Sequence, residues 1–223
     1  MSDFDVIHAR AMSRKGGAEG LNALLPRVAS LDELCATSDD RYLAAITQCI
    51  FKAGFVWRVI NNKWPGFEEA FQGFVPVYWQ QVSPEVLENL SRDERIVRNM
   101  QKISTVPDNA RMIVEASQQH NGFGCFLAQW PSSDQVGLLQ WLKKSGSRLG
   151  GATPQYFLRS IGWDGFVLSG DVIRALRHTG MLDAAPSSQK GLLQVQMAFN
   201  QWHEETGLPY SHLSRILACS VDD

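Results

Sequence analysis

The spacing of apolar residues is the feature that most constrains the fold, because it follows the helical period along nearly the whole chain beyond Gly20. Apolar side chains recur every three to four residues, and short turns containing glycine or proline separate these segments. No stretch alternates apolar and polar residues for long enough to form a strand of a sheet. We therefore predict an all-α fold, built as a two-lobed helical bundle.

Local signals predict where many of these helices begin and end. Ser30 and Glu33 have the spacing of a capping box, in which hydroxyl and carboxylate satisfy free N–H groups at a helix start. A helix is predicted to open at Asp39, and prolines predict restarts after Trp64 and after Ser83. Further helical segments are predicted over Arg92–Ile103, Pro107–Gln119, Phe123–Gln129, Asp134–Lys144, Pro154–Ser160, Asp171–Thr179, Ser188–Glu205 and Tyr210–Cys219.

The bulk composition is that of an ordinary globular protein. The chain has 223 residues, of which 44% are hydrophobic and 20% are charged, and its formal net charge is −2. We predict an N-terminal arm or extension over residues 1–20, followed by one domain of two closely packed lobes over residues 21–223. The near-neutral charge does not favour a nucleic-acid binder, so any attraction to a polyanion must come from a local face.

The cysteines and the lengths of the apolar runs indicate the cellular compartment in which the protein is expected. Cys35, Cys49, Cys125 and Cys219 lie far apart and lack the spacing of a C-x-x-C motif. We expect reduced, mostly buried thiols rather than a disulfide or zinc framework. No apolar run is long enough to span a bilayer, and the chain does not start with a signal-peptide pattern. The predicted compartment is the cytoplasm, with no membrane association.

A glycine-rich turn forms a predicted hairpin between two amphipathic helices. The first helix ends at Gly146, and the second begins with Thr153 as the N-cap and Pro154 at the first helical position. Gly150 and Gly151 carry no side chain, so the backbone N–H groups between the helices can approach a phosphate. Taken alone, the turn favours an ordinary connection between helices.

An aspartate at a particular distance changes this interpretation. Asp171 follows Thr153 by 18 positions and stands at the start of the next predicted helix. A plain N-cap is one interpretation of Asp171. In the other interpretation, the glycine-rich turn holds the phosphate of a nucleotide, and the carboxylate of Asp171 acts on that nucleotide.

With Asp171 included, the chain resembles the helix-hairpin-helix DNA glycosylase superfamily and, within it, the 3-methyladenine DNA glycosylase I-like proteins. The likeness extends from roughly Asp40 to Gly180. The matching blocks are Ala53-Gly54-Phe55-Val56-Trp57, Phe67-Glu68-Glu69-Ala70-Phe71, Ile96-Val97-Arg98-Asn99 with Lys102-Ile103, Asn109-Ala110 and Gly151-Ala152-Thr153-Pro154-Gln155-Tyr156. The resemblance implies a helix-hairpin-helix fold and hydrolysis of the N-glycosidic bond of a flipped, damaged base in DNA repair.

Three departures from the family's pattern refine this expectation. The family usually has a glutamate that contacts the base eight positions before Trp57, and this chain has Cys49 there. Bifunctional relatives have a lysine at the position of Thr153, which has no amine to form a Schiff base, so the resemblance implies a monofunctional enzyme. The family's zinc-binding Cys and His pairs have no counterpart, since His8 and His178 stand alone. We expect no metal and no cofactor, apart from a structural monovalent cation that hairpin carbonyls of the superfamily can hold.

The resemblance also implies roles for individual residues. Asp171 is the expected catalytic residue, because a carboxylate stabilises the oxocarbenium-like state that forms as the base departs. The candidates for the base pocket are Trp57, Phe55, Cys49, Trp64 and Tyr156, although aromatic residues at helical spacing more commonly lie in the core. The expected DNA-binding residues are Gly146, Arg148, Gly150, Gly151, Thr153, Lys143 and Lys144, with Arg174 and Arg177 after Asp171. In contrast, Arg95, Arg98 and Lys102 are expected to stabilise their own helix, with Asp93 and Glu94 nearby.

Three functional hypotheses stay open at this point. The first is a monofunctional DNA glycosylase that removes an alkylated purine of the 3-methyladenine type. The second keeps the fold and the mechanism but changes the modified base, because Cys49 replaces the usual glutamate. The third is a non-catalytic helix-hairpin-helix protein that only binds DNA. In each case we expect a monomer, and in the first two the partner is double-stranded DNA containing a damaged base.

Overall fold

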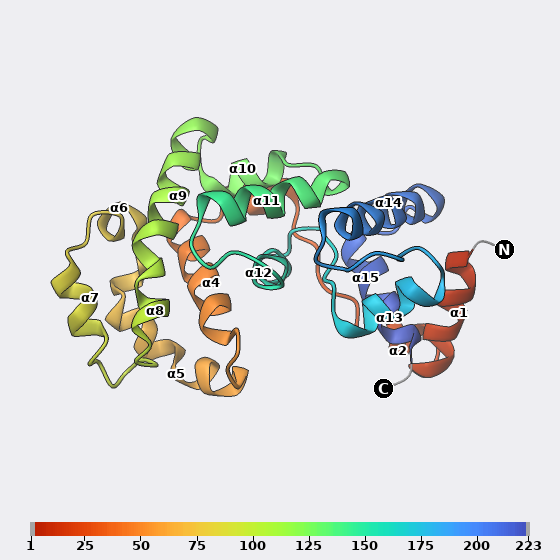
Figure 1. Cartoon of the computed structure of the whole chain (residues 1–223), viewed down its shortest axis with the longest axis horizontal. Helices are drawn as coiled ribbons and strands as arrows, with labels where there is room; N and C mark the ends of the chain where they lie inside the picture. Colours follow the sequence, from red (N-terminus) through yellow and green to blue (C-terminus); the bar gives the residue numbers. More distant parts are fainter. Residues whose placement is uncertain (1–2, 222–223) are drawn as a thin grey trace. The chain divides into compact units, whose positions relative to one another are not determined.

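The computed structural model describes residues 3–221, and every regular element within that range is a helix (Figure 1). The all-α prediction is confirmed. The chain divides into two compact units. Among the described residues, the first unit comprises 3–29, 131–138 and 162–221, and the second comprises Ser30–Trp130 and Leu139–Ile161.

The first unit is a cluster of helices around α15, which packs against both α1 and α13. Its buried core includes the rings of Phe4, Phe166, Phe199 and Trp202. The helices of this unit are α1 (Asp3–Arg14), α2 (Ala18–Asn22), the 3-10 turn η2 (Ser132–Asp134), α13 (Gly170–His178), α14 (Gln189–Thr206) and α15 (Tyr210–Ser220). Helix α11 (Gln135–Ser145) begins in the first unit and continues into the second.

The described part of the expected N-terminal arm is instead a packed helix. Phe4, Ile7 and Ala11 recur at helical spacing along α1, and all three are buried in the core of the first unit. Leu21 of α2 joins the same core. Because this segment contributes apolar surface to the core, it is an integral part of the first unit. Met1 and Ser2 lie outside the described residues.

The second unit is centred on α4, which contacts α5, α9, α10 and α12. Tyr42, Leu43, Ile46, Ile50 and Phe51 are buried along α4 at helical spacing. The helices of this unit are α3 (Leu31–Ala36), α4 (Asp39–Lys52), α5 (Trp57–Ala70), the 3-10 turn η1 (Gln72–Phe74), α6 (Pro76–Trp79), α7 (Pro84–Leu90), α8 (Met100–Ile103), α9 (Thr105–His120), α10 (Phe123–Gln129) and α12 (Thr153–Ser160).

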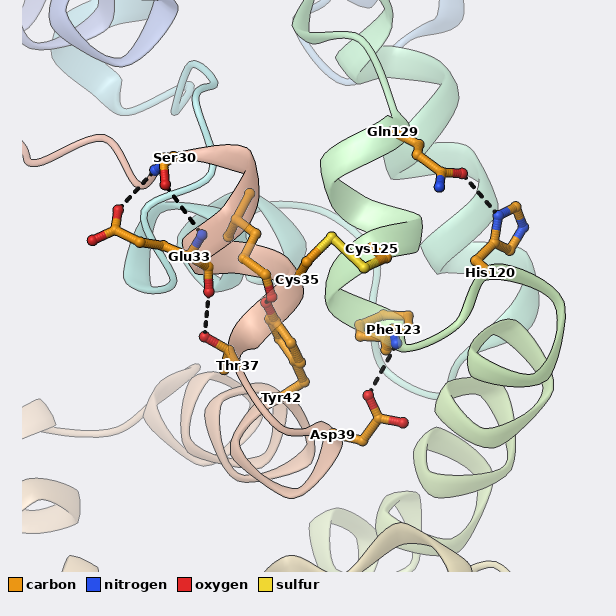
Figure 2. Close-up of a disulfide and its surroundings, with 11 residues drawn as sticks. Ser30, Glu33, Cys35, Thr37, Asp39, Tyr42, His120, Phe123, Cys125 and Gln129 are labelled. Carbon is orange, nitrogen blue, oxygen red and sulfur yellow. Dashed lines mark hydrogen bonds between the residues drawn. A yellow bond between two sulfur atoms is a disulfide. The ribbon is translucent and has the colours of Figure 1, made fainter.

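The helix boundaries agree with most of the sequence signals. The capping box is confirmed: the backbone N–H of Ser30 donates to Glu33 Oε2 at 2.8 Å, and the N–H of Glu33 donates to Ser30 Oγ at 3.1 Å (Figure 2). The predicted segments from Pro107 onward match α9 to α15 within two residues at each end.

Two predicted helix positions are wrong. The chain from Arg92 to Asn99 contains no regular helix, and only α8 follows it. There Asp93 Oδ1 accepts the backbone N–H of Arg95 at 2.9 Å, and such a local hydrogen bond competes with helix formation. Pro65 lies inside α5 instead of starting a helix. This proline is exposed, so water can satisfy the backbone carbonyl that it leaves without a donor.

The prediction of reduced thiols is wrong for two of the four cysteines. Cys35 of α3 and Cys125 of α10 form a disulfide across a sequence separation of 90 residues (Figure 2). Gly124 permits this contact, because a Cβ added there would lie 1.9 Å from the carbonyl oxygen of Leu34. The spacing of cysteines along a chain does not reveal such packing between distant helices. Cys49 and Cys219 are free and buried, as expected.

Helix length and hydropathy also bear on the membrane prediction. Within residues 3–221, no helix combines the length and the apolar character that crossing a bilayer requires.

Candidate active site

The second unit contains an open cavity of about 710 Å³. It lies between the last turn of α4, the loop to α5 and the first two turns of α12. Gly54, with a φ of 72°, lets the chain turn sharply after α4 and present the next three side chains at the surface. The lining residues are Cys49, Lys52, Ala53, Gly54, Phe55, Val56, Trp57, Ala152, Thr153, Tyr156, Arg159 and Ser160.

Three aromatic residues of this cavity form what we call the open wall: Phe55, Trp57 and Tyr156. The rings of Trp57 and Tyr156 meet edge to face, with their centroids 5.4 Å apart. Phe55 is 43% exposed and Trp57 is 49% exposed, so neither is a core residue. The structure therefore brings together four of the five residues expected to line a pocket: Phe55, Trp57, Tyr156 and Cys49.

The fifth expected pocket residue, Trp64, lies elsewhere. Its ring stacks on Phe67 at 5.2 Å and on Phe74 at 5.5 Å between centroids, and its indole N–H donates to Glu68 Oε1 at 3.0 Å. It is not among the residues that line the cavity. Trp64 follows Trp57 by two helical turns, and the sequence alone did not distinguish their environments.

The charged residues of the cavity are cationic. Lys52 and Arg159 line it, and its lining contains no aspartate or glutamate. The ammonium of Lys52 lies 5.7 Å from the ring centroid of Trp57 and donates to Gln48 Oε1 at 3.0 Å. The hydrogen-bond acceptor of this lysine is therefore a neutral amide and not a carboxylate.

Lys102 does not line the cavity but lies next to the open wall, and the sequence interpretation missed this position. Instead of pairing within its own helix, it is buried and donates to the carbonyl oxygens of Phe51 and Ala53, at 3.1 and 2.6 Å. Its ammonium also lies 5.0 Å from the ring centroid of Phe55. Burial lowers the pKa of Lys102, and the nearby charge of Arg148 lowers this pKa further. Lys102 thus caps the C-terminal end of α4 and supports one end of the open wall.

Cys49 lies at the buried side of the cavity. Its sulfur is 4.0 Å from the hydroxyl oxygen of Ser160, which itself donates to the carbonyl of Phe157 at 2.7 Å. Burial raises the pKa of the Cys49 thiol, although the hydroxyl of Ser160 and the charge of Lys52 act in the opposite direction. At the position where the resemblance led us to expect a glutamate, the chain therefore has a thiol whose pKa is raised.

The predicted hairpin leads directly into this cavity. The side chain of Asn109 holds it in place, accepting the N–H of Ser147 at 2.8 Å and donating to the carbonyl of Ser147 at 3.2 Å. Leu149 is buried beneath the turn, and Arg148 and Gly151 have positive φ angles of 55° and 63°. A turn fixed from below in this way presents its outer backbone to solvent.

The residues of the hairpin have different roles. Gly146 is needed for packing, since an added Cβ would lie 2.6 Å from Leu149 and 2.8 Å from Asn109. Gly151 is exposed, with nothing within 4 Å of an added Cβ. Lys143, Lys144 and Arg148 are exposed around the turn, and Arg148 donates to Gln101 Oε1 at 2.7 Å. Helix α12 begins at Thr153 with Ala152 as the N-cap, so the predicted N-cap is shifted by one residue.

Asp171 belongs to the first unit, whereas the cavity and the hairpin belong to the second. It is the second residue of α13, and the N-cap is Ser169, whose hydroxyl accepts the N–H of Val172 at 3.3 Å. Asp171 is therefore not the N-cap of its helix. Its carboxylate is about half exposed and pairs with Arg174 one turn later. This exposed pair resembles many surface ion pairs, which contribute little to stability.

A zinc site of the kind that the resemblance raised needs a cluster of Cys and His ligands. In the part of the chain that the structure describes, no three His, Cys, Asp or Glu side chains cluster as metal ligands would. His8 stacks on Phe4 at 6.2 Å between centroids, and His178 lies beside Val6 and Arg10.

An all-helical unit with a glycine hairpin that opens into an aromatic cavity defines a class, that of helix-hairpin-helix proteins. A family model described as methyladenine glycosylase matches residues 34–162. The chain belongs to the methyladenine glycosylase family. The matched region covers nearly all of the second unit, including the hairpin and the whole cavity, and ends before Asp171.

Solved structures of related proteins share the fold. A 3-methyladenine DNA glycosylase I (TAG) is 24% identical over 57% of this chain and 80% of its own, with a TM-score of 0.50. The 3-methyladenine DNA glycosylase I (TAG) from Staphylococcus aureus is 20% identical over 69% of this chain and 92% of its own, with a TM-score of 0.52. The Methanocaldococcus jannaschii 8-oxoguanine glycosylase/lyase, in complex with DNA containing 8-oxoguanine, is 14% identical over 95% and 94%, with a TM-score of 0.53. No curated protein sequence matches the chain.

Proposed function

We propose that this protein is a monofunctional DNA glycosylase that hydrolyses the N-glycosidic bond of a damaged purine flipped out of double-stranded DNA. The observation that carries the proposal is the open aromatic cavity at the foot of the hairpin, within the region that matches the family. Its volume of about 710 Å³ lies within the range of small-molecule sites. Flipping a nucleotide costs about a few kcal/mol, and stacking on aromatic side chains recovers about 1–3 kcal/mol per base.

The hairpin supplies a means of holding the DNA backbone next to the cavity. Ala152 and Thr153 both end the hairpin and line the cavity. A phosphate bound by the N–H groups near Gly150 and Gly151 therefore has its nucleotide at the cavity entrance. Lys143, Lys144 and Arg148 add positive charge around this turn, which compensates for the near-neutral charge of the whole chain.

We propose Asp171 as the catalytic residue. Its carboxylate would stabilise positive charge on the deoxyribose as the base leaves and would accept the proton of the attacking water. The pairing with Arg174 supports this role in one respect, because an exposed pair costs little to exchange for another cationic partner. Thr153 cannot form a Schiff base, so we propose that no strand cleavage follows base release.

The remaining properties follow from this activity. Hydrolysis by a carboxylate and water needs neither metal nor cofactor, although the hairpin carbonyls are a site for a structural monovalent cation. Double-stranded DNA with a damaged base is the proposed partner, a monomer the proposed state and the cytoplasm the proposed compartment. The family favours an alkylated purine of the 3-methyladenine type, whereas Cys49 in place of the family's glutamate favours a different modified base.

The activity is tested with duplexes that each contain one modified base, scored for abasic sites by strand cleavage after alkali. We expect wild-type protein to release at least one of these bases, and Asp171→Asn to release it about 10²–10³-fold more slowly with DNA affinity retained. Asp183→Asn is the matched control, because Asp183 is another exposed aspartate of the first unit that pairs with a cation. A fully active Asp171→Asn variant would refute the catalytic role, and strand cleavage without alkali would refute the monofunctional assignment.

The hairpin is tested separately by DNA affinity. Gly151→Glu places a negative charge where a phosphate is proposed to bind, and we expect all DNA sequences to bind about tenfold or more weakly. Gly180→Glu is the control, since Gly180 is exposed, has a similar positive φ and has equally open surroundings. Unchanged affinity of the Gly151 variant would contradict the proposed phosphate site. Tight DNA binding by a wild-type protein that releases no base would instead favour a non-catalytic module.

A further inference from the structure

We propose that Lys102 is a positioning residue for base release, which fixes the turn that presents the open wall at a set distance from the hairpin. This proposal rests on the proposed glycosylase function and assigns a role in it to a residue outside the cavity lining. It is derived from the contacts of Lys102 with the end of α4 and from the contacts that its own segment makes with the hairpin.

The turn after α4 is held only weakly by its own packing. The five residues from position 53 to position 57 are all exposed, so burial of apolar surface does not fix their conformation. Two backbone hydrogen bonds close the turn, from the N–H of Ala53 to the carbonyl of Cys49 at 3.1 Å and from the N–H of Phe55 to the carbonyl of Lys52 at 3.0 Å. The glycine between Ala53 and Phe55 has many accessible conformations, so contacts from outside the turn are needed to select one of them.

Lys102 makes three such contacts. Its ammonium donates to the carbonyl oxygens of Phe51 and Ala53, at 3.1 and 2.6 Å. It also lies 5.0 Å from the ring centroid of Phe55, the first residue of the open wall. The two carbonyls belong to the residues on either side of the last residue of α4. A single cation therefore fixes the direction in which the chain leaves this helix.

The surroundings of Lys102 disfavour a charged side chain. Lys102 is 6% exposed. Burial lowers its pKa, and the nearby charge of Arg148 lowers this pKa further. An apolar side chain would fill the same space without the cost of removing a charge from water. Packing alone therefore does not account for an ammonium at this position, whereas its donation to two carbonyls of the turn does.

The backbone of Lys102 is itself fixed by its neighbours. Its N–H donates to the side-chain oxygen of Asn99 at 3.2 Å, and its carbonyl accepts the hydroxyl of the buried Thr105 at 2.7 Å. Ile103 and Val106 of the same segment are fully buried. Because this backbone is already ordered, its side chain can hold an exposed turn at little further cost in conformational entropy.

The segment around Lys102 also holds the hairpin. Gln101 Oε1 accepts a hydrogen bond from Arg148 at 2.7 Å, and the side chain of Asn109 binds the N–H and the carbonyl of Ser147 at 2.8 and 3.2 Å. One segment of the second unit thus contacts both the hairpin and the turn that presents the open wall. A flipped base meets the wall correctly only when the two are held in register, and a small displacement of positioned groups slows a reaction strongly.

The first test measures hydrogen–deuterium exchange of the N–H groups of Ala53 and Phe55, without DNA. We expect both groups to exchange at least about tenfold faster in Lys102→Met than in the wild type, because the turn opens more readily without its outside donor. Phe71→Ala is the control for stability, since Phe71 is a fully buried ring outside the cavity lining and its loss should leave exchange in the turn unchanged. Unchanged exchange in Lys102→Met, or the same acceleration in Phe71→Ala, would overturn the proposal.

The second test measures base release in a single turnover at saturating protein, together with DNA affinity. We expect Lys102→Met to release the base about 10–100-fold more slowly per folded molecule. Its DNA affinity should be retained, because the contacts of the hairpin with Gln101 and Asn109 remain. Lys102→Arg keeps a cationic donor and should recover most of the rate. A variant that loses affinity but keeps the wild-type rate at saturation would contradict the positioning role.

Lys63→Met is the matched lysine control for this second test. Lys63 also donates to a backbone carbonyl, that of Glu94 at 2.7 Å, but it lies on α5 outside the cavity lining. We expect its loss to change neither the rate of base release nor the DNA affinity. An equal fall in rate for Lys63→Met and Lys102→Met would mean that Lys102 is merely structural.

The two tests separate this proposal from the function on which it rests. Faster exchange in the turn of Lys102→Met, with no base released by the wild type, would refute the glycosylase function alone and support Lys102 as the residue that positions the open wall. Base release at the wild-type rate by Lys102→Met would refute the positioning role alone. If Lys102→Met does not fold, Lys102→Gln takes its place in both tests, because its amide removes the charge and shortens the side chain while keeping a donor.

Discussion

Two groups of aromatic residues in the second unit have similar compositions and different surroundings. One is the open wall of Phe55, Trp57 and Tyr156, and the other is what we call the closed stack. The closed stack consists of Trp64, Phe67, Phe71, Phe74 and Trp79. Helix α5 contributes to both groups, with Trp57 at its first position and Trp64 two turns later.

The geometry of the rings distinguishes the two groups. In the closed stack most rings lie nearly parallel, as Phe71 and Phe74 do with an interplanar angle of 9°. Trp79 is buried there, and its indole N–H donates to the carbonyl of Phe71 at 2.8 Å. In the open wall Trp57 and Tyr156 are nearly perpendicular, and lysine ammonium groups lie over two of the three rings. Filled contacts in the stack stabilise the fold, whereas exposed rings in the wall remain available for a ligand.

The largest expected effect is on the closed stack. Phe71→Ala removes a fully buried ring between two other rings, and we expect the free energy of unfolding to fall by about 3–5 kcal/mol. Urea denaturation followed by circular dichroism measures this loss. Phe55→Ala in the open wall should cost less than about 1 kcal/mol, because much of that ring is already in water. Similar losses for the two variants would mean that both groups are structural.

The second expected effect is on activity instead of stability, and it concerns the open wall instead of the closed stack. Trp57→Ala should lower the rate of base release by about 10–100-fold, since stacking of one base contributes about 1–3 kcal/mol. We expect its midpoint of urea denaturation to stay close to that of the wild type. Trp64→Phe is the control: it keeps a stacked ring and should leave the rate per folded molecule unchanged. A Trp57→Ala variant that is destabilised but fully active would remove Trp57 from the proposed site.

These two tryptophans show how far the sequence could predict the site. Periodicity and caps predicted α9 to α15 closely, because such signals are local. The sequence blocks that resemble the family predicted that Trp57 and Tyr156 line one pocket. The structure places both residues in the lining of the same cavity. Trp64 has the same residue type and lies on the same helix, and only packing against Phe67 and Phe74 distinguishes it.

Interactions between distant segments account for the other failures. Lys102 has Asp93 and Glu94 nearby in sequence, which suggested that it stabilises its own helix. Its actual partners are carbonyls at the end of α4, about fifty positions away along the chain. The Cys35–Cys125 disulfide is similarly invisible, because its two helices pack only in the folded chain.

Lys102 lies between the open wall and the core next to the closed stack. Its ammonium is near both the exposed Phe55 and the buried Phe51, whose ring meets that of Phe67 edge to face. Lys102→Met leaves the carbonyls of Phe51 and Ala53 without their donor, and we expect a loss of about 1–3 kcal/mol. The loss should depend on pH. Because the folded pKa of Lys102 is lowered, the unfolded chain holds this proton more tightly between that pKa and the ordinary value of 10.5. The wild type should therefore gain stability relative to the variant as the pH rises through that window.

Parallel urea titrations of wild type and Lys102→Met, at neutral pH and at a pH close to 10.5, measure this difference. The free energy of unfolding of the variant is subtracted from that of the wild type at each pH. This subtraction cancels the titration of the other lysines and tyrosines, which both proteins share. A difference that stays constant, or that shrinks with rising pH, would contradict the role of burial in lowering this pKa.

The smallest effect concerns Cys49, at the buried side of the open wall. Burial raises the pKa of this thiol, and the thiolate is the reactive form. We expect iodoacetamide to modify Cys49 more slowly than it modifies an unstructured cysteine at neutral pH, and the rate should rise as the pH approaches the raised pKa. Cys219→Ala leaves Cys49 as the remaining free thiol, and mass spectrometry without reductant measures its modification. Because Cys49 and Trp57 line one cavity, free 3-methyladenine should slow the reaction, and the same probe should not protect Cys49 in Trp57→Ala. Protection that persists without Trp57 would mean that the ligand reaches the thiol without stacking on the open wall, which would separate the recognition of the base from its aromatic residues.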